Sequence, residues 1–190
     1  MEEKFIHVID DLYPTRFINN LESLLTSVNF SWFLQSNTSY DVLDKTNDVF
    51  QFTHQFISKQ GDYSPFLSEV SILSPFIEKK FNIEVIDTLR VKANLLTCNK
   101  DFDTNTHHPL HVDADESDYW SLLYYVNDSD GDTFFKLSEN DFKRVSPKKG
   151  RAVFFNSNIE HASSSPVKTD TRIVVNSILK IKKTKDFTNG

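Results

Sequence analysis

The stretch "YWSLLYYVNDSDGDTFFKL", residues 119–137, contains two apolar runs rich in Tyr, Phe, Leu and Val, separated by a polar turn cluster. Each run has the length and composition of a β-strand, and the Asn, Asp, Ser and Gly residues between the runs are typical of a turn. No helix fits between the two predicted strands. The stretch therefore indicates two successive strands of a sheet-rich region, separated by a turn.

Similar apolar runs separated by turn residues occur on both sides of this stretch. Further runs rich in Val, Ile, Leu and Phe occupy residues 84–97, 108–113, 150–155 and 172–181. The clusters "SPKKG" and "SSSPVKTD" supply additional turns. Evenly spaced short strands without a long helix between them predict an antiparallel sandwich or barrel, which we place at about residues 84–182.

The first part of the chain, about residues 1–83, contains helical patterns instead. Residues 14–30 have a helical stripe made of Phe17, Ile18, Leu21, Leu24, Leu25 and Val28, with Pro14 near the expected first turn. Residues 64–81 predict a second helical region, interrupted by Pro75. Residues 30–35 and 49–57 alternate aromatic and polar side chains, which predicts two short strands. The outline is an α+β fold in which N-terminal helices pack on one sheet, within a single domain over residues 1–190.

Composition narrows the classes of function. The net charge of −6 disfavours a broad nucleic-acid-binding surface, and the four glycines form no phosphate-binding loop motif. The single cysteine, Cys98, allows neither an intrachain disulfide nor a cysteine-rich zinc site. We find no signal peptide and no stretch of membrane-spanning length, so we expect a soluble cytoplasmic protein. The oligomeric state stays open.

A metal site is indicated by the short motif His111-Val-Asp113. Residues two apart on a strand point to the same face, so both side chains can bind one ion. The motif alone is weak, because a surface histidine beside a turn acid is commoner. Downstream, the predicted strand at residues 150–155 runs on to His161, which supplies a third ligand. Two histidines and a carboxylate are the ligand set of non-haem Fe(II) oxygenases, and they suit iron better than catalytic zinc.

The chain resembles the 2-oxoglutarate- and Fe(II)-dependent dioxygenases, in particular their prolyl-4-hydroxylase-like branch and its small phage-encoded members. The resemblance covers roughly Arg90 to Leu179 and rests on five pieces in the family's order. These are "HVD", "YYVN", "DGDTFF", "VSPKKGRAVFF" and "HASSSPVKTDTR". It implies a double-stranded β-helix of the jelly-roll or cupin type. It also implies Fe(II), O2 and the co-substrate 2-oxoglutarate, with His111, Asp113 and His161 as both the metal ligands and the catalytic centre.

The resemblance further implies a co-substrate site. Arg172 is expected to bind the distal carboxylate of 2-oxoglutarate, since a guanidinium pairs well with a carboxylate, although an arginine opening a strand could also form a surface ion pair. Tyr125 is expected to help, but Tyr124 could be the inward residue instead. Asn176 faces the same way as Arg172, and Asn94 alternates onto one face with Arg90 and Lys92, which could line the pocket or face solvent.

Two features before His111 lie outside these assignments. The polar segment at residues 96–109 is long for the family, and it is either a lid over the substrate or a surface loop. His107 and His108 have no acid two residues later, so we expect both to be surface residues.

The implied reaction is hydroxylation of a C–H bond, with succinate and CO2 as co-products. Related halogenases have a small residue in place of the carboxylate ligand, so Asp113 favours hydroxylation. The leading substrate class is a prolyl residue in a peptide or protein. The alternatives are a free amino acid, another small metabolite or a nucleobase, and a non-catalytic metal-binding module of the same fold.

Overall fold

The structure is a computed structural model that describes residues 5–39 and 46–184. Its elements follow one another along the chain as β1 (Ile6–Ile9), α1 (Thr15–Leu25), β2 (Phe33–Gln35), β3 (Gln51–Ile57), the 3-10 helix η1 (Leu67–Glu69), α2 (Leu73–Phe81), β4 (Ile83–Thr97), β5 (Tyr119–Tyr125), β6 (Thr133–Lys136), β7 (Phe142–Val145), β8 (Ala152–Asn156), β9 (His161–Ser163) and β10 (Thr171–Lys183). Helices come first and strands dominate the rest, which confirms the predicted α+β order.

The strands form two antiparallel sheets. The major sheet has the order β1-β8-β5-β10-β4-β3-β2, and the minor sheet has the order β7-β6-β9. The long strands β4 and β10 pair along most of their length, with two register irregularities after Ile178. This arrangement is the predicted double-stranded β-helix, and three strands from the N-terminal part extend its major sheet at both ends.

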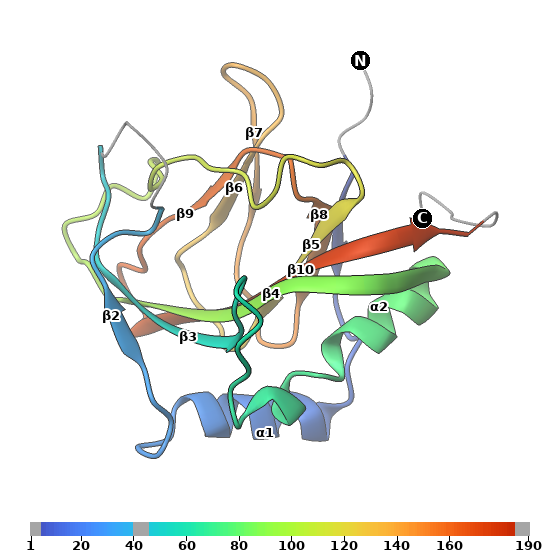
Figure 1. The fold of residues 1–190 in the computed structure, drawn as a ribbon. Helices are drawn as coiled ribbons and strands as arrows, with labels where there is room; N and C mark the ends of the chain where they lie inside the picture. The colour runs from blue at the N-terminus through green and yellow to red at the C-terminus, as the bar shows by residue number, and fades with distance from the viewer. Residues whose placement is uncertain (1–4, 40–45, 185–190) are drawn as a thin grey trace.

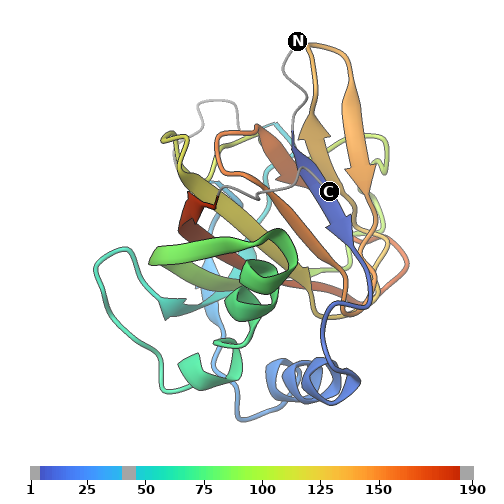
Figure 2. The same ribbon diagram turned by 90° about the vertical axis from the view of Figure 1, so that its right-hand side faces the viewer.

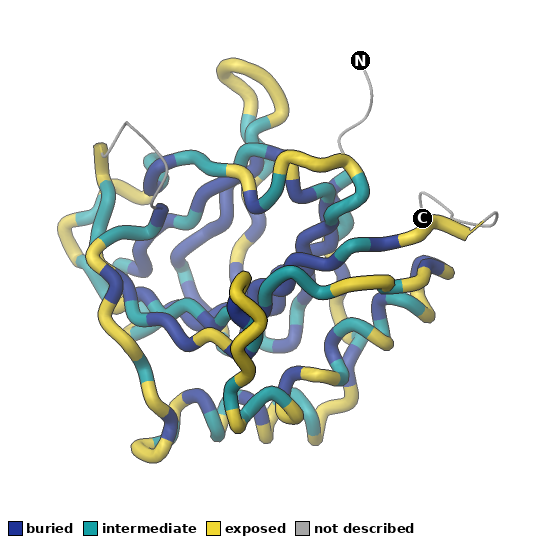
Figure 3. The backbone as a smooth tube through the Cα atoms, in the orientation of Figure 1, coloured by how far each residue is buried: buried dark blue, intermediate teal, exposed yellow. Residues whose placement is uncertain are grey.

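Helices α1 and α2 lie against one face of the major sheet, and the minor sheet lies on the other side (Figures 1 and 2). Alternation along β5 separates two apolar cores. Leu122 and Tyr124 belong to the core under the helices, whereas Leu123 and Tyr125 belong to the core between the sheets. The central strands β5, β8 and β10 are buried on both faces, as the dark segments of Figure 3 show.

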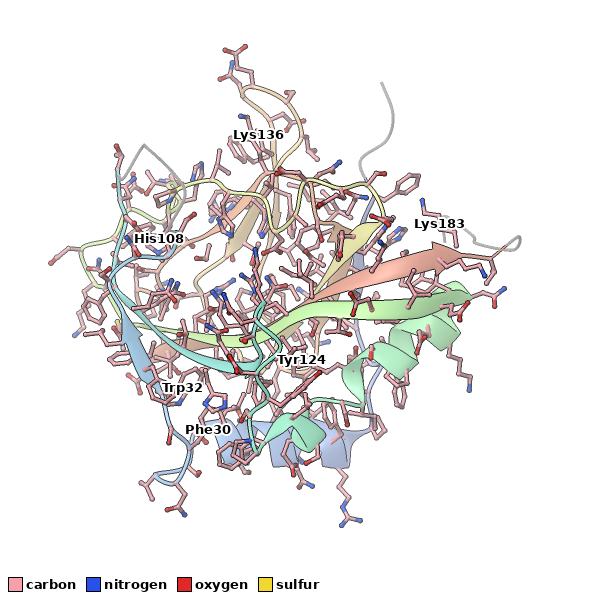
Figure 4. The ribbon with its side chains drawn as sticks, viewed as in Figure 1. Phe30, Trp32, His108, Tyr124, Lys136 and Lys183 are labelled. Carbon is pink, nitrogen blue, oxygen red and sulfur yellow. The ribbon has the colours of Figure 1, made fainter. Side chains whose placement is uncertain are left out.

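Helix α1 buries Leu21 and Leu25 against the sheet, as its sequence pattern predicts. The helix ends at Leu25, however, and Val28 lies beyond it, fully exposed. The indole of Trp32 donates a hydrogen bond to the Leu25 carbonyl and packs edge-on against Phe30, and both rings are labelled near α1 in Figure 4. This hydrogen bond satisfies one of the backbone carbonyls that lack an intrahelical partner at the end of the helix. The prediction from the apolar stripe, which included Val28, therefore made the helix too long.

Pro75 does not interrupt the second helix. It is the third residue of α2, where a helix needs no backbone N–H donor, so proline is tolerated there. The break in the helical pattern falls earlier, between η1 and α2. Helix α2 ends at Asn82, whose left-handed conformation (φ 51°) turns the chain directly into β4.

Two strand predictions are wrong in detail. Residues 108–113 form no regular strand, and His111 makes only an isolated bridge with His161. The strand that begins at Ala152 ends at Asn156, and His161 opens a different strand, β9, in the other sheet. The short strands β1 and β7 were not predicted, because four residues give too little alternation to recognise.

No helix within residues 5–39 and 46–184 is long and apolar enough to span a membrane.

Candidate active site

The structure brings His111, Asp113 and His161 together between the two sheets. One possible ligand atom from each residue lies within 4.8 Å of the others. His111 and Asp113 come from the segment before β5, and His161 is the first residue of β9. The backbones of His111 and His161 exchange two hydrogen bonds, of 3.0 and 2.9 Å, which fix the two imidazoles side by side.

Both imidazoles have a defined tautomer. Nδ1 of His161 lies 2.9 Å from the carbonyl oxygen of Ile159, and Nδ1 of His111 lies 3.4 Å from that of Pro109. Since a carbonyl only accepts, Nδ1 must carry the proton and Nε2 keeps its lone pair. Burial, followed by the neighbouring His161, lowers the pKa of His111 to about 4. A neutral imidazole with a free Nε2 is the form that binds a metal.

The Asp113 carboxylate is buried and held by three side chains. Its oxygens accept hydrogen bonds from Ser121 Oγ (2.7 Å), from Asn176 Nδ2 (3.0 and 3.1 Å) and from Arg90 Nη2 (3.0 Å). Burial alone would raise the pKa of this carboxyl, but the neighbouring His161 and then Arg90 hold the pKa below its ordinary range. The carboxylate is therefore ionised and fixed in orientation.

This donor set fits Fe(II). Two imidazoles and one carboxylate on one side of the ion would leave further coordination positions free for other ligands. Asp113 Oδ2 lies 3.6 Å from Nε2 of His161, so the two atoms face one another closely enough to share an ion. The hydrogen bonds from Ser121 and Asn176 provide the outer support that metal-binding carboxylates usually have.

His111, Asp113 and His161 line a cavity, and Arg172 of β10 lines the same cavity. The Arg172 side chain is buried, since the residue is only 3% exposed. Its Nε donates to the Gly131 carbonyl (2.7 Å), and its Nη2 donates to Thr133 Oγ1 (2.7 Å). Within the described residues, Nη1 has no hydrogen-bond partner. The guanidinium is thus fixed by two neutral groups and keeps its charge for a ligand, so it forms no surface ion pair.

Gly131 has a packing role that its turn sequence did not indicate. A Cβ atom at this position would lie 2.6 Å from the Ser164 carbonyl oxygen and 3.0 Å from Cδ of Arg172. Only glycine lets the chain pass this close, and the close approach brings the Gly131 carbonyl to Arg172.

The two neighbouring tyrosines face opposite sides of the major sheet. The Tyr125 hydroxyl pairs with Thr133 Oγ1 at 2.6 Å, and the Tyr125 ring lies 5.7 Å from the Arg172 guanidinium. Tyr124, labelled in Figure 4, instead packs edge-on against Tyr13 in the core under the helices. Tyr125 is therefore the inward residue, and it acts on Arg172 through Thr133, a residue that sequence reasoning missed.

Cross-strand pairing divides the inner face of the major sheet into two halves. Opposite partners in a ladder share a face, and the apolar half comprises Leu123, Tyr125, Val153 and Phe155. The polar half comprises Arg90, Lys92 and Asn94 of β4 with Arg172 and Asn176 of β10. All five polar side chains line the cavity, so the polar face of β4 is turned toward the site and not toward bulk solvent.

His108 is a second residue whose role the sequence concealed. It was expected at the surface, but it is fully buried and lines the cavity (labelled in Figure 4). Its Nδ1 lies 2.7 Å from the Asn47 carbonyl oxygen, and its Nε2 lies 3.2 Å from Ser165 Oγ. The segment at residues 96–109 is tied to the chain near β10 by hydrogen bonds from Cys98 and Asn99. Such long-range partners leave no local signal in the sequence.

Comparison with known families gives the site its context. Residues 96–180 match the family profile described as the 2OG-Fe(II) oxygenase superfamily, and this segment contains His111, Asp113, His161 and Arg172. The matched segment, 85 of the 190 residues, is similar to the 2OG-Fe(II) oxygenase superfamily. Enzymes of this superfamily use Fe(II), 2-oxoglutarate and O2, and the group formed by His111, Asp113 and His161 suits that chemistry. None of the curated proteins matches the chain in sequence.

Solved structures share the fold of this chain at low sequence identity. An oxidoreductase of the 2OG-Fe(II) oxygenase family from Burkholderia pseudomallei is 11% identical, with a TM-score of 0.70, covering 93% of this chain and 85% of its own. A prolyl hydroxylase from Trichoplax adhaerens, in complex with a hypoxia-inducible-factor peptide fragment, is 13% identical, with a TM-score of 0.64 and coverages of 93% and 84%. A Pseudomonas putida prolyl-4-hydroxylase is 15% identical, with a TM-score of 0.60 and 93% of both chains covered.

Proposed function

We propose that this protein is a 2OG-Fe(II) oxygenase that hydroxylates a C–H bond of its prime substrate and converts 2-oxoglutarate to succinate and CO2. The observation that carries the proposal is one cavity lined both by two histidines with a buried carboxylate and by a buried arginine with a free Nη1. The first group suits a redox-active metal, and the second suits the far carboxylate of a dicarboxylic acid.

The proposed division of labour follows from the contacts. Nε2 of His111, Nε2 of His161 and the Asp113 carboxylate hold Fe(II), which when bound supplies the redox chemistry with O2 that side chains cannot perform. Ser121, Asn176 and Arg90 keep the carboxylate ionised and correctly oriented. A carboxylate ligand at position 113 leaves no place for a halide, which favours hydroxylation.

The proposed co-substrate site lies at the Arg172 end of the cavity. Arg172 binds the distal carboxylate of 2-oxoglutarate, and Tyr125 positions Thr133 beside it. Asn94 and Asn176 line the wall between Arg172 and the three metal-binding residues. The apolar side chains of Leu96, Leu123 and Val174 cover the same stretch and limit the access of water.

The first substrate class to test is a prolyl residue in a peptide or protein. Two of the structural neighbours are prolyl hydroxylases, but at 13% and 15% identity they carry the fold and leave the substrate open. A free amino acid or another small molecule is the second class of substrate. The positive charge of the cavity favours a substrate of this class that carries a carboxylate.

The proposal is tested by measuring succinate formed from 2-oxoglutarate when anaerobically Fe(II)-loaded protein is exposed to O2. We expect slow succinate formation without prime substrate, abolished in His161→Ala. In Arg172→Ala, succinate formation should fall and recover at high 2-oxoglutarate concentration, since only co-substrate binding is impaired. His107→Ala is the matched control, because the His107 ring packs at a tilt against Phe134, outside the three-residue group. Absence of both iron binding and succinate would refute the proposal.

A further inference from the structure

The cavity is strongly cationic for a chain whose net charge is −6. Arg90, Lys92, Lys59 and Arg172 line it, and Asp113 is the only acid in that lining among the described residues. Bound Fe(II) would add positive charge, and 2-oxoglutarate would bring two negative charges. With both bound, the net charge of the cavity would remain positive, so the cavity would attract a further anion.

Two of the four cationic side chains already have interactions that explain their position. Arg90 pairs with Asp113 at 3.0 Å, and Arg172 is fixed by Gly131 and Thr133 beside the proposed co-substrate carboxylate. Lys92 and Lys59 differ from these two arginines in having no such partner among the described residues. Across residues 5–39 and 46–184, neither forms a hydrogen bond or an ion pair.

The ladder separates Lys92 from the Arg172 end. Lys92 lies directly opposite Asn176, which holds Asp113, whereas Arg172 lies opposite Leu96. The four-residue step along β10 from Asn176 to Arg172 corresponds to about 13 Å. A 2-oxoglutarate that extends from the metal-binding residues to Arg172 would have both carboxylates engaged and would leave Lys92 without an anion from the part of the chain that the structure describes.

An unpaired ammonium inside a cavity is costly. Burial, and then the positive charge of Arg90, lower the pKa of Lys92 to about 7. A ligand anion within hydrogen-bond distance would offset this cost with a charge-assisted hydrogen bond. Lys59, exposed where the cavity opens, would raise the local concentration of anions at the entrance.

We propose that the prime substrate carries a carboxylate and that Lys92 binds it. This inference rests on the proposed function and narrows its substrate class. Among prolyl compounds it selects free proline or a C-terminal prolyl residue, because an internal residue has no carboxylate of its own. Lys92 lies on β4, outside the segment that matches the family profile, residues 96–180.

The test compares carboxylate probes with their neutral carboxamides. One arm uses the twenty common L-amino acids, and a second uses the dipeptide Gly-Pro, each beside its amide. Succinate formation reports turnover, and calorimetric titration of Mn(II)- and 2-oxoglutarate-loaded protein reports affinity without turnover. We expect at least one acid to bind and to stimulate succinate formation while its amide does not. The arm that responds distinguishes a free amino acid from a peptide end.

Variants tie the effect to Lys92. Lys92→Met should weaken binding of the active acid by about 10- to 100-fold, as expected when a hydrogen bond to a charged group is lost. Lys92→Arg should restore part of this affinity because it keeps the charge. Lys182→Met, at the exposed end of β10, is the matched control. Thermal unfolding of each variant checks that the fold is intact.

Three results would overturn the inference. The amides could bind as well as the acids, no acid could bind, or Lys92→Met could raise the KM for 2-oxoglutarate, which would assign Lys92 to the co-substrate. Failure of the proposed function looks different. In that case wild-type protein forms no succinate under any condition, while calorimetry still reports whether carboxylate probes bind through Lys92.

Discussion

Tyr125 and Tyr124 are adjacent in the chain and chemically identical, yet their hydroxyls have opposite situations. The Tyr125 hydroxyl pairs with Thr133 Oγ1, which accepts a hydrogen bond from Arg172. The Tyr124 hydroxyl is buried without a hydrogen-bond partner within the described structure. The pair therefore provides a matched comparison of a hydroxyl that positions the site and one that does not.

Tyr125→Phe should raise the KM for 2-oxoglutarate by about 2- to 10-fold, the effect of losing one hydrogen bond, with a smaller change in kcat. Tyr124→Phe should leave both constants unchanged and leave stability unchanged or slightly improved, because it removes an unsatisfied polar atom. Steady-state succinate formation over a range of 2-oxoglutarate concentrations measures this. Equal effects of the two substitutions would show that Thr133 holds Arg172 without help from Tyr125.

At the scale of elements, the sequence of a strand reveals which side chains share a face but not what that face contacts. The alternation in β5 correctly assigned Ser121, Leu123 and Tyr125 to one face, because period two depends only on neighbours in the chain. It left undecided whether that face was inward, and whether Arg90, Lys92 and Asn94 met a cavity or solvent. Those answers depend on cross-strand register and on which helices cover the other face, which no local pattern contains.

The same limit explains the rest of the site. That the three metal-binding candidates and Arg172 lie in one cavity could be predicted because their motifs follow one another in the order that the resembled family has. Thr133 and His108 could not be, because their roles come from partners more than thirty residues away. The expected strand around His111 was wrong because a single bridge to His161, and not a ladder, holds that segment.

Helix α1 supports the sheet that carries the site, through Leu21 in particular. Leu21→Ala should lower the free energy of unfolding by about 2–5 kcal/mol, because it leaves a cavity in the core under the helices. For a chain of this size the midpoint of thermal unfolding should fall by about 2–4 °C for each kcal/mol. Asn20→Ala, on the exposed side of the same helix, should change the midpoint little. A loss below 1 kcal/mol for Leu21→Ala would contradict this packing.

At the scale of the whole molecule, buried histidines make stability depend on pH. Burial lowers the pKa of His108 and of His111 to about 4, below the ordinary value of 6.5. Between these values the unfolded chain takes up protons that the folded chain cannot. Their stabilising contribution is therefore complete above pH 6.5 and is lost as the pH falls toward 4.

Urea unfolding of metal-free protein from pH 7.5 to pH 4.5 measures this loss. The unfolding midpoint should decline over that range, and His108→Asn should decline less steeply, because one of the two histidines no longer contributes. An unchanged slope in His108→Asn would show that His108 accepts a proton without unfolding, through movement of Asn47 or Ser165.

The division of the major sheet's inner face has an evolutionary consequence. Lys92 and Asn94 lie toward the β2 end of the sheet, whereas Tyr125 and Phe155 lie toward the β1 end, in the tightly packed interior. Replacements of the cavity-facing residues of β4, such as Lys92 and Asn94, should therefore change which reactant the cavity admits at less cost to folding than replacements of Tyr125 or Phe155. Such a layout lets descendants of one ancestral enzyme acquire new reactants by few substitutions, while the oxidising centre is inherited intact.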